Sequence, residues 1–104
     1  MKLTDLQISL IGAQIDLPGG SRVVLIDVGG RKDVSAEDHN CNVYRVNANG
    51  DISWKVMAPR PLMERDSFVD MELDKGLLRA NRFFGSEYEI DLETGYAQEI
   101  GWHK

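Results

Sequence analysis

The chain has 104 residues, with a single cysteine, only three prolines and no long apolar run. Cys41 has no partner for an internal disulfide, which suits a reducing compartment. No apolar stretch approaches the roughly 20 residues that a membrane-spanning helix needs. The first residues also lack the apolar segment and cleavage site of a signal peptide. We therefore expect a cytoplasmic protein with no membrane contact.

Basic residues are scarce in the C-terminal part of the chain. Residues 1–63 hold seven acidic and seven basic side chains, whereas residues 64–104 hold ten acidic and five basic ones. The C-terminal part therefore carries the whole net charge of −5. Because an acidic surface repels phosphate backbones, we expect no nucleic-acid partner. Such a surface would attract a basic protein, although acidity also serves solubility alone.

Helical periodicity is nearly absent, and apolar residues instead alternate with polar ones. This alternation between turn signals is typical of half-buried antiparallel strands. Asn49-Gly50 separates two such runs and favours a tight hairpin. Residues 23–26 are apolar on both faces, as in a central strand covered on both sides. We expect about eight strands, the others lying near residues 6–17 (with a bend at Gly12), 43–48, 52–56, 69–73, 77–81 and 87–92, followed by a last strand that ends near Trp102.

The two halves of the chain resemble each other. Tyr44–Ala48 aligns with Tyr88–Leu92 at a spacing of 44 residues, and each segment leads into a turn that contains glycine. A period in the forties with four strands is the size of a propeller blade. We therefore predict an all-β single domain over 1–104, with four-stranded meander units at about 5–57 and 67–104 and a linker at about 58–66.

Two such units cannot close a propeller ring, which has about four or more blades. They would pack as a sandwich or as a curled sheet. Open sheet edges invite pairing with other chains, so a sandwich-like monomer and a homodimer both satisfy the pattern.

The segment Asn42–Trp54 contains a strand, a short polar turn with glycine, and a tryptophan four residues later. In this it resembles the outer hairpin of a pyrroloquinoline-quinone-type propeller repeat. The second copy keeps Asp91 and Thr94-Gly95 of that pattern, but has Glu99 where tryptophan is expected. The resemblance implies a blade-like architecture. Because the family's cofactor lies in the channel of a closed ring, we expect no cofactor here.

The connection from Gly29 to Cys41 is long for a compact domain, and such loops are commonly functional. Ser35 and Asp38 have the spacing of a cap on a single helical turn. Asp38, His39 and Cys41 carry groups that bind zinc, but a zinc site needs about four ligands. His39 could also serve Cys41 as a base, but a partly buried structural thiol explains the cysteine better. We predict a surface recognition loop without a metal.

Aromatic residues give a second candidate surface. Phe83 and Phe84 follow Arg82 in a short connection. Exposed rings there would anchor an interface, whereas buried rings would belong to the core. The remaining large aromatics at strand positions, Tyr44, Trp54, Tyr88 and Trp102, are predicted to face inward.

Carboxylates form two rows, one at Asp70 and Glu72 and one at Glu87 and Glu89, with Arg79 on the strand between them. Paired carboxylates could cleave glycosides. Cross-strand ion pairs on a solvated face explain the rows more simply.

These observations predict a non-enzymatic protein-binding module with no cofactor or metal and a basic protein as partner. One concrete form is a bacterial immunity or antitoxin-like protein that blocks a basic toxin. The alternatives are a small metal-dependent enzyme using the 29–41 loop and a structural subunit of a larger β assembly. The residues predicted to contact the partner are Asp33, Glu37, Asp38, His39, Arg82, Phe83 and Phe84.

Overall fold

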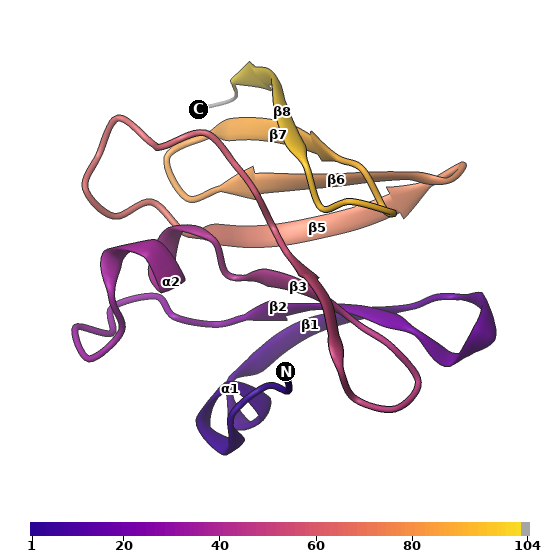
Figure 1. Ribbon diagram of the computed structural model, residues 1–104. Helices are drawn as coiled ribbons and strands as arrows, with labels where there is room; N and C mark the ends of the chain where they lie inside the picture. Colours follow the sequence, from indigo (N-terminus) through magenta and orange to yellow (C-terminus); the bar gives the residue numbers. More distant parts are fainter. Residues whose placement is uncertain (103–104) are drawn as a thin grey trace.

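The computed structural model describes residues 1–102 and contains two four-stranded antiparallel sheets, each with its strands in chain order (Figure 1). The first sheet consists of β1 (Ile11–Asp16), β2 (Arg22–Ile26), β3 (Val43–Val46) and β4 (Ile52–Lys55). The second consists of β5 (Phe68–Asp74), β6 (Leu77–Arg82), β7 (Ser86–Ile90) and β8 (Ala97–Trp102). The short helices are α1 (Asp5–Ser9), α2 (Ala36–Asn40) and the 3-10 turn η1 (Pro18–Gly20). The predicted eight strands in two meander units are confirmed.

No helix within residues 1–102 has the length and apolar character to cross a membrane.

The segment at residues 6–10, predicted as a strand, is mostly helical. Thr4 caps α1: its hydroxyl accepts a hydrogen bond from the backbone N–H of Gln7, and the Gln7 side chain accepts one from the N–H of Thr4. Leu6 and Leu10, four residues apart, then lie on one face of the helical turn. The alternation fits a strand and a helical turn equally in so short a segment, and the cap decides between them. The first strand therefore begins at Ile11.

A shared core joins the inner faces of the two sheets. From the first sheet it contains Val23, Leu25, Val43, Trp54 and Val56, and from the second Phe68, Leu78, Ala80, Tyr88, Ile90 and Ala97. The arrangement is therefore a sandwich rather than a curled sheet. Tyr44, Trp54 and Tyr88 are buried as predicted, but Trp102 is 61% exposed because the first sheet does not cover the end of β8.

A second, smaller core lies on the outer face of the first sheet. Val24, Ile26, Tyr44 and Val46 pack there against Leu3, Leu10 and Val34. Figure 1 shows α1 against the first sheet at the end of the molecule away from the second sheet. β2 and β3 are consequently buried on both faces, as the apolar run at residues 23–26 predicts.

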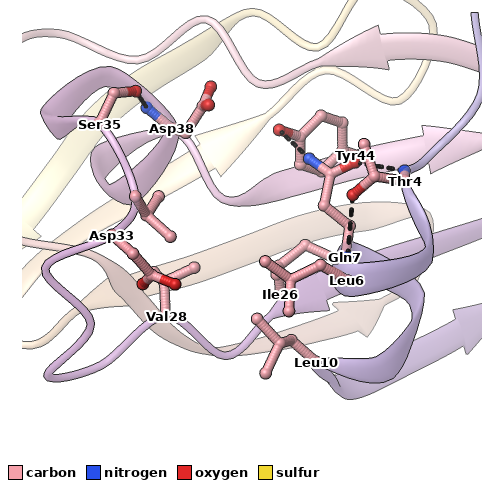
Figure 2. A pocket seen from close by; sticks show the side chains of 11 residues that line it. Thr4, Leu6, Gln7, Leu10, Ile26, Val28, Asp33, Ser35, Asp38 and Tyr44 are labelled. Atoms are coloured by element: carbon pink, nitrogen blue, oxygen red, sulfur yellow. Dashed lines mark hydrogen bonds between the residues drawn. The ribbon is translucent and has the colours of Figure 1, made fainter.

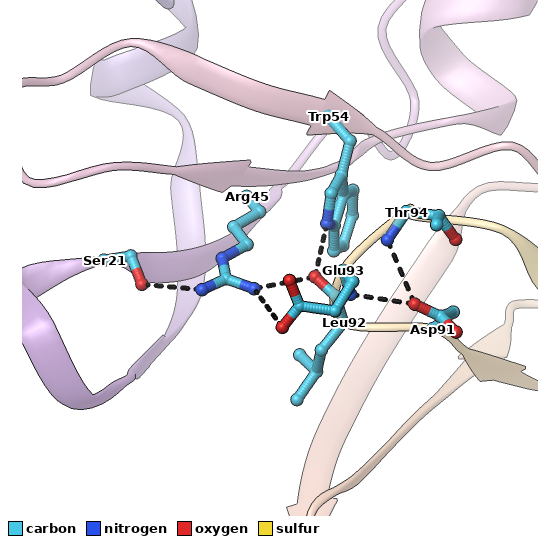
Figure 3. Close-up of polar contacts among 7 residues, drawn as sticks. All are labelled: Ser21, Arg45, Trp54, Asp91, Leu92, Glu93 and Thr94. Atoms are coloured by element: carbon cyan, nitrogen blue, oxygen red, sulfur yellow. Dashed lines mark hydrogen bonds and ion pairs between the residues drawn. The ribbon is translucent and has the colours of Figure 1, made fainter.

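Two side chains of the first sheet hold the turn between β7 and β8 (Figure 3). The indole N–H of Trp54 donates to the carbonyl of Leu92 at 2.7 Å. Arg45 donates to the same carbonyl at 2.8 Å and lies 3.9 Å from the Glu93 carboxylate. A Cβ at Gly95 would lie 2.6 Å from the Trp54 ring, so only glycine permits this contact.

The side chain of Asp91 stabilises the same turn. Its carboxylate accepts hydrogen bonds from the backbone N–H groups of Thr94 and Glu93, at 3.0 and 2.8 Å. These two bonds lower the pKa of Asp91, so the carboxylate is charged at neutral pH.

Asn42 connects the sheets at the other end of the sandwich. Asn42 is 1% exposed, and its side-chain amide forms hydrogen bonds with the main chains of β2 and β5, as a peptide group of an intervening strand would. The amide nitrogen donates to the carbonyls of Ile26 and Phe68 at 2.8 and 2.9 Å, and the amide oxygen accepts from the N–H of Phe68 at 2.9 Å. The two units are thus joined through main-chain groups as well as through the core.

Candidate functional site

The long connection between β2 and β3 folds over the outer face of the first sheet and ends in α2. The predicted cap is confirmed: the Ser35 hydroxyl accepts a hydrogen bond from the backbone N–H of Asp38 at 3.1 Å. The first turn of α2 therefore presents Glu37 and Asp38.

A pocket of about 190 Å³, here called the loop pocket, opens between this connection and α1 (Figure 2). Its walls are apolar and consist of Leu6, Leu10, Ile26, Val28 and Val34. Its polar lining consists of Thr4, Gln7, Asp33, Ser35, Asp38 and Tyr44. The loop pocket is therefore an apolar hollow with two carboxylates among its lining groups.

Both carboxylates of the loop pocket lie beside a cation. Arg31 donates to both oxygens of Asp33, at 3.1 and 2.7 Å, and this hydrogen bonding lowers the pKa of Asp33. Asp38 forms an ion pair with Lys55. Burial lowers the pKa of Lys55, but the hydrogen bond to Asp38 and the surrounding charges outweigh burial and raise it overall. Lys55 is therefore charged at neutral pH.

Tyr44 contributes a neutral polar group to the loop pocket. The residue is 4% exposed, and its hydroxyl accepts a hydrogen bond from the Gln7 side chain at 3.2 Å. Burial raises the pKa of Tyr44, and the charge of Asp38 raises it further against the opposing charge of Lys55. The Tyr44 phenol of the loop pocket is thus in its protonated, neutral form at neutral pH.

Together these groups suit a ligand with an aliphatic stem and a cationic end. The apolar walls would cover the stem, and the carboxylates would face the charge. Lysine and arginine side chains have this form.

The structure brings only part of the predicted surface together. Asp33 and Asp38 line the loop pocket, while Glu37 is exposed on α2 and borders a neighbouring cleft. His39 is 7% exposed and Arg82 is 2% exposed, so the structure buries these two residues rather than presenting them at the surface.

Arg82 is buried because several partners from distant parts of the chain surround it. Its guanidinium lies 4.8 Å from the ring centres of both Phe68 and Tyr88. It donates to the carbonyls of Pro59 and Asn40, at 2.8 and 3.0 Å, and to the Tyr88 hydroxyl at 2.7 Å. Arg82 thus joins the linker, α2 and the second sheet.

Phe83 and Phe84 lie in the turn between β6 and β7, among residues that do not line the loop pocket. The Phe83 ring is 66% exposed, whereas Phe84 is partly buried and packs edge-on against it at 5.1 Å. The backbone N–H of Phe84 is held by the Asp66 carboxylate at 3.0 Å. The aromatic and acidic parts of the predicted surface are therefore separate.

Several lining residues of the loop pocket carried no functional signal in the sequence. Gln7 and Leu6 lie in a segment predicted as a strand, and Tyr44 was assigned to the core alone. Thr4 could have been recognised, because its spacing from Gln7 is that of a capping box. That signal predicts the helix but not the pocket beside it.

His39 and Cys41 do not form part of a metal cluster in the described chain. No group of three or more His, Cys, Asp or Glu side chains within residues 1–102 is placed to hold a metal ion. The Nδ1 atom of His39 is buried with no hydrogen-bond partner in this part of the chain, and Cys41 is a partly buried free thiol.

Comparison with known proteins places the chain in a family. The family model described as "Domain of unknown function (DUF7957)" matches residues 14–102, so the chain belongs to this family. The matched range includes the second half of β1, strands β2 to β8 and the loop with α2, but not α1. No curated protein and no solved structure matches the chain.

Proposed function

From the geometry of the loop pocket, we propose that the protein is a non-enzymatic module that binds a basic protein partner. The single observation that carries the proposal is the loop pocket itself, with apolar walls and the carboxylates of Asp33 and Asp38. A lysine or arginine side chain of the partner would enter it, its stem against the walls and its charge near the carboxylates.

Charge supports the same kind of partner. The chain carries a net charge of −5, which accelerates the encounter with a basic protein. The low pKa of Asp33 keeps one carboxylate of the loop pocket charged throughout the neutral range. One oxygen of the Asp38 carboxylate accepts a hydrogen bond from Lys55. Within residues 1–102 the other carboxylate oxygen of Asp38 accepts no hydrogen bond.

The molecule has a second acidic surface, on the outer face of the second sheet. Glu72 of β5 and Glu89 of β7 flank Arg79 of β6 in register, with Asp70 and Glu87 nearby. This surface lies on the opposite side of the sandwich from the loop pocket. We assign the partner to the loop pocket, because the carboxylates of Asp33 and Asp38 lie there beside apolar walls.

A bacterial immunity or antitoxin-like role, in which the protein blocks a basic toxin, is the concrete form that we propose. Small size, acidity and a rigid β scaffold with a polar loop support it. In this role the partner's cationic side chain would be withheld from its own target.

Affinity capture tests the proposal. The tagged full-length chain is used as bait in an extract of the source organism, at low and at high salt. We expect a basic protein to be retained at low salt and released at high salt, because exposed ion pairs are screened. The double variant Asp33→Asn/Asp38→Asn should lose this protein.

The matched control is Asp70→Asn/Glu72→Gln, which removes the same charge from the other acidic surface. It should retain the partner. Absence of any low-salt partner, or equal retention by both double variants, would contradict the proposal.

A further inference from the structure

The outer edge of β8 has unpaired main-chain groups. On one side β8 pairs with β7 along its length. On the other side only its beginning is covered, where Met57 forms a parallel bridge to Tyr96 and accepts a hydrogen bond from the N–H of Ala97 at 2.9 Å. The chain then leaves the edge at Pro59, which has no N–H to donate. Within residues 1–102 no strand covers the edge from residue 98 to residue 102.

Exposed apolar side chains lie beside this open edge. A cleft of about 760 Å³ separates it from the linker, and Leu62, Met63 and Trp102 line that cleft together. Leu62 is fully exposed, Met63 is 52% exposed and Trp102 is 61% exposed. Ile100, on the edge itself, is 45% exposed. Of the residues before and in the linker, only Met57 pairs with this edge.

The other outer strand of the second sheet differs in its charge. β5 carries Asp70, Glu72 and Asp74, and charged side chains protect an edge against pairing. Glu99 is the one charged residue of β8. β8 is therefore the less protected edge of this sheet.

We propose that the outer edge of β8 pairs antiparallel with β8 of a second copy of the chain. An extended strand can form hydrogen bonds with the unpaired main-chain donors and acceptors of this edge, whereas a helix or a small molecule cannot pair with them in the same way. A two-fold arrangement brings the same surface of each copy against the other, so the apolar side chains of both are covered at once.

Charge favours a second copy as the source of that strand. Most of the C-terminal unit is acidic, so two copies repel each other over its other surfaces. The β8 cleft contains Arg60 as well as Asp66 and Glu99, and Asp66 is buried. Two copies can therefore approach each other at the β8 cleft without bringing a large excess of like charge together.

Sedimentation equilibrium of the full-length chain over a concentration series tests this pairing. We expect a monomer–dimer equilibrium whose upper limit is twice the 11.7 kDa mass of the chain. Ile100→Lys should shift the equilibrium at least tenfold toward monomer, because a lysine on an edge opposes pairing. The matched control is Leu77→Lys, at a side chain of similar exposure (43%) on β6, and it should leave the equilibrium unchanged.

Hydrogen exchange identifies the edge directly. Amides in residues 98–102 should be protected in concentrated samples and exchange faster in dilute ones. A monomer at every concentration, or a dimer that Ile100→Lys leaves intact, would overturn the proposal. Protection that appears only when a different protein is added would overturn it as well, since a foreign strand would then be the occupant.

Discussion

At the scale of single residues, the contact between the two units depends on Gly95. This glycine has φ = 79°, in the left-handed region, and its missing Cβ makes room for the Trp54 ring. We predict that Gly95→Ala lowers the free energy of unfolding by about 1–2 kcal/mol through backbone strain. Overpacking against the tryptophan should cost about 1–3 kcal/mol more.

Gly76→Ala separates these two contributions. Gly76 has φ = 81°, and a Cβ there would meet nothing within 4 Å. Urea denaturation should show only the strain in this control. Equal losses in the two variants would show that Trp54 does not press on Gly95.

A second prediction concerns the contribution of Asn42 to stability. Asn42→Ala should destabilise the protein by about 2–4 kcal/mol, because it leaves buried main-chain groups of Ile26 and Phe68 without partners. Asn81→Ala is the control: its exposed hydrogen bond to Asp70 should contribute less than about 1 kcal/mol. Thermal or urea unfolding of the two variants measures the difference.

The burial of polar residues such as Asn42 and Arg82 could not be predicted from the sequence. Polar residues are usually exposed, so the sequence placed Arg82 on the surface. Its burial depends on Pro59 and Asn40, 23 and 42 residues away along the chain. Local patterns contain no signal for such contacts, because tertiary packing creates them.

At the scale of elements, apolar alternation located the strands well. Antiparallel strands with one solvated face produce that alternation directly, and Asn49-Gly50 fixed the β3–β4 hairpin. The prediction failed at residues 6–10, where a five-residue helix and a short strand have similar patterns. The cap at Ser35 was predictable because its cause is local. The loop pocket was not, since it arises where α1 meets a loop about 25 residues further along.

The Ser35 cap gives the third prediction. Ser35→Ala should lower the free energy of unfolding by about 1 kcal/mol, because the N–H of Asp38 loses its acceptor. The same change at Ser53, exposed on β4, should have little effect. If binding depends on the placement of Asp38, Ser35→Ala should also weaken the partner captured at low salt, whereas Ser53→Ala should not.

The lining of the loop pocket predicts a loss of stability in alkaline solution. The pKa values of Tyr44 and Lys55 are raised above their ordinary values of 10.0 and 10.5. Between the unfolded and folded pKa values the folded protein binds more protons, so the free energy of unfolding falls as pH rises. The onset is near pH 10 for Tyr44.

Urea denaturation of the wild type and Tyr44→Phe, from neutral pH upward, checks this. The stability difference between them should be constant below about pH 10 and then shrink. A difference that stays constant through the alkaline range would contradict the burial of the phenol.

At the scale of the whole molecule, the two units should unfold as one. They share a core, and Asn42, Arg45 and the Met57 bridge link their main chains. Tryptophan fluorescence reports on Trp54 between the sheets, and far-ultraviolet circular dichroism reports on all strands. We predict coincident transitions in urea. Two separate transitions would show that the units are independent.

Calorimetric titration of the chain with the captured protein tests whether the loop pocket binds a basic partner. We expect Asp33→Asn/Asp38→Asn to weaken the affinity at least tenfold, because both carboxylates that face the partner's cation lose their charge. Asp70→Asn/Glu72→Gln should bind nearly as tightly as the wild type. Equal weakening by both double variants, or weakening by the second alone, would contradict the claim.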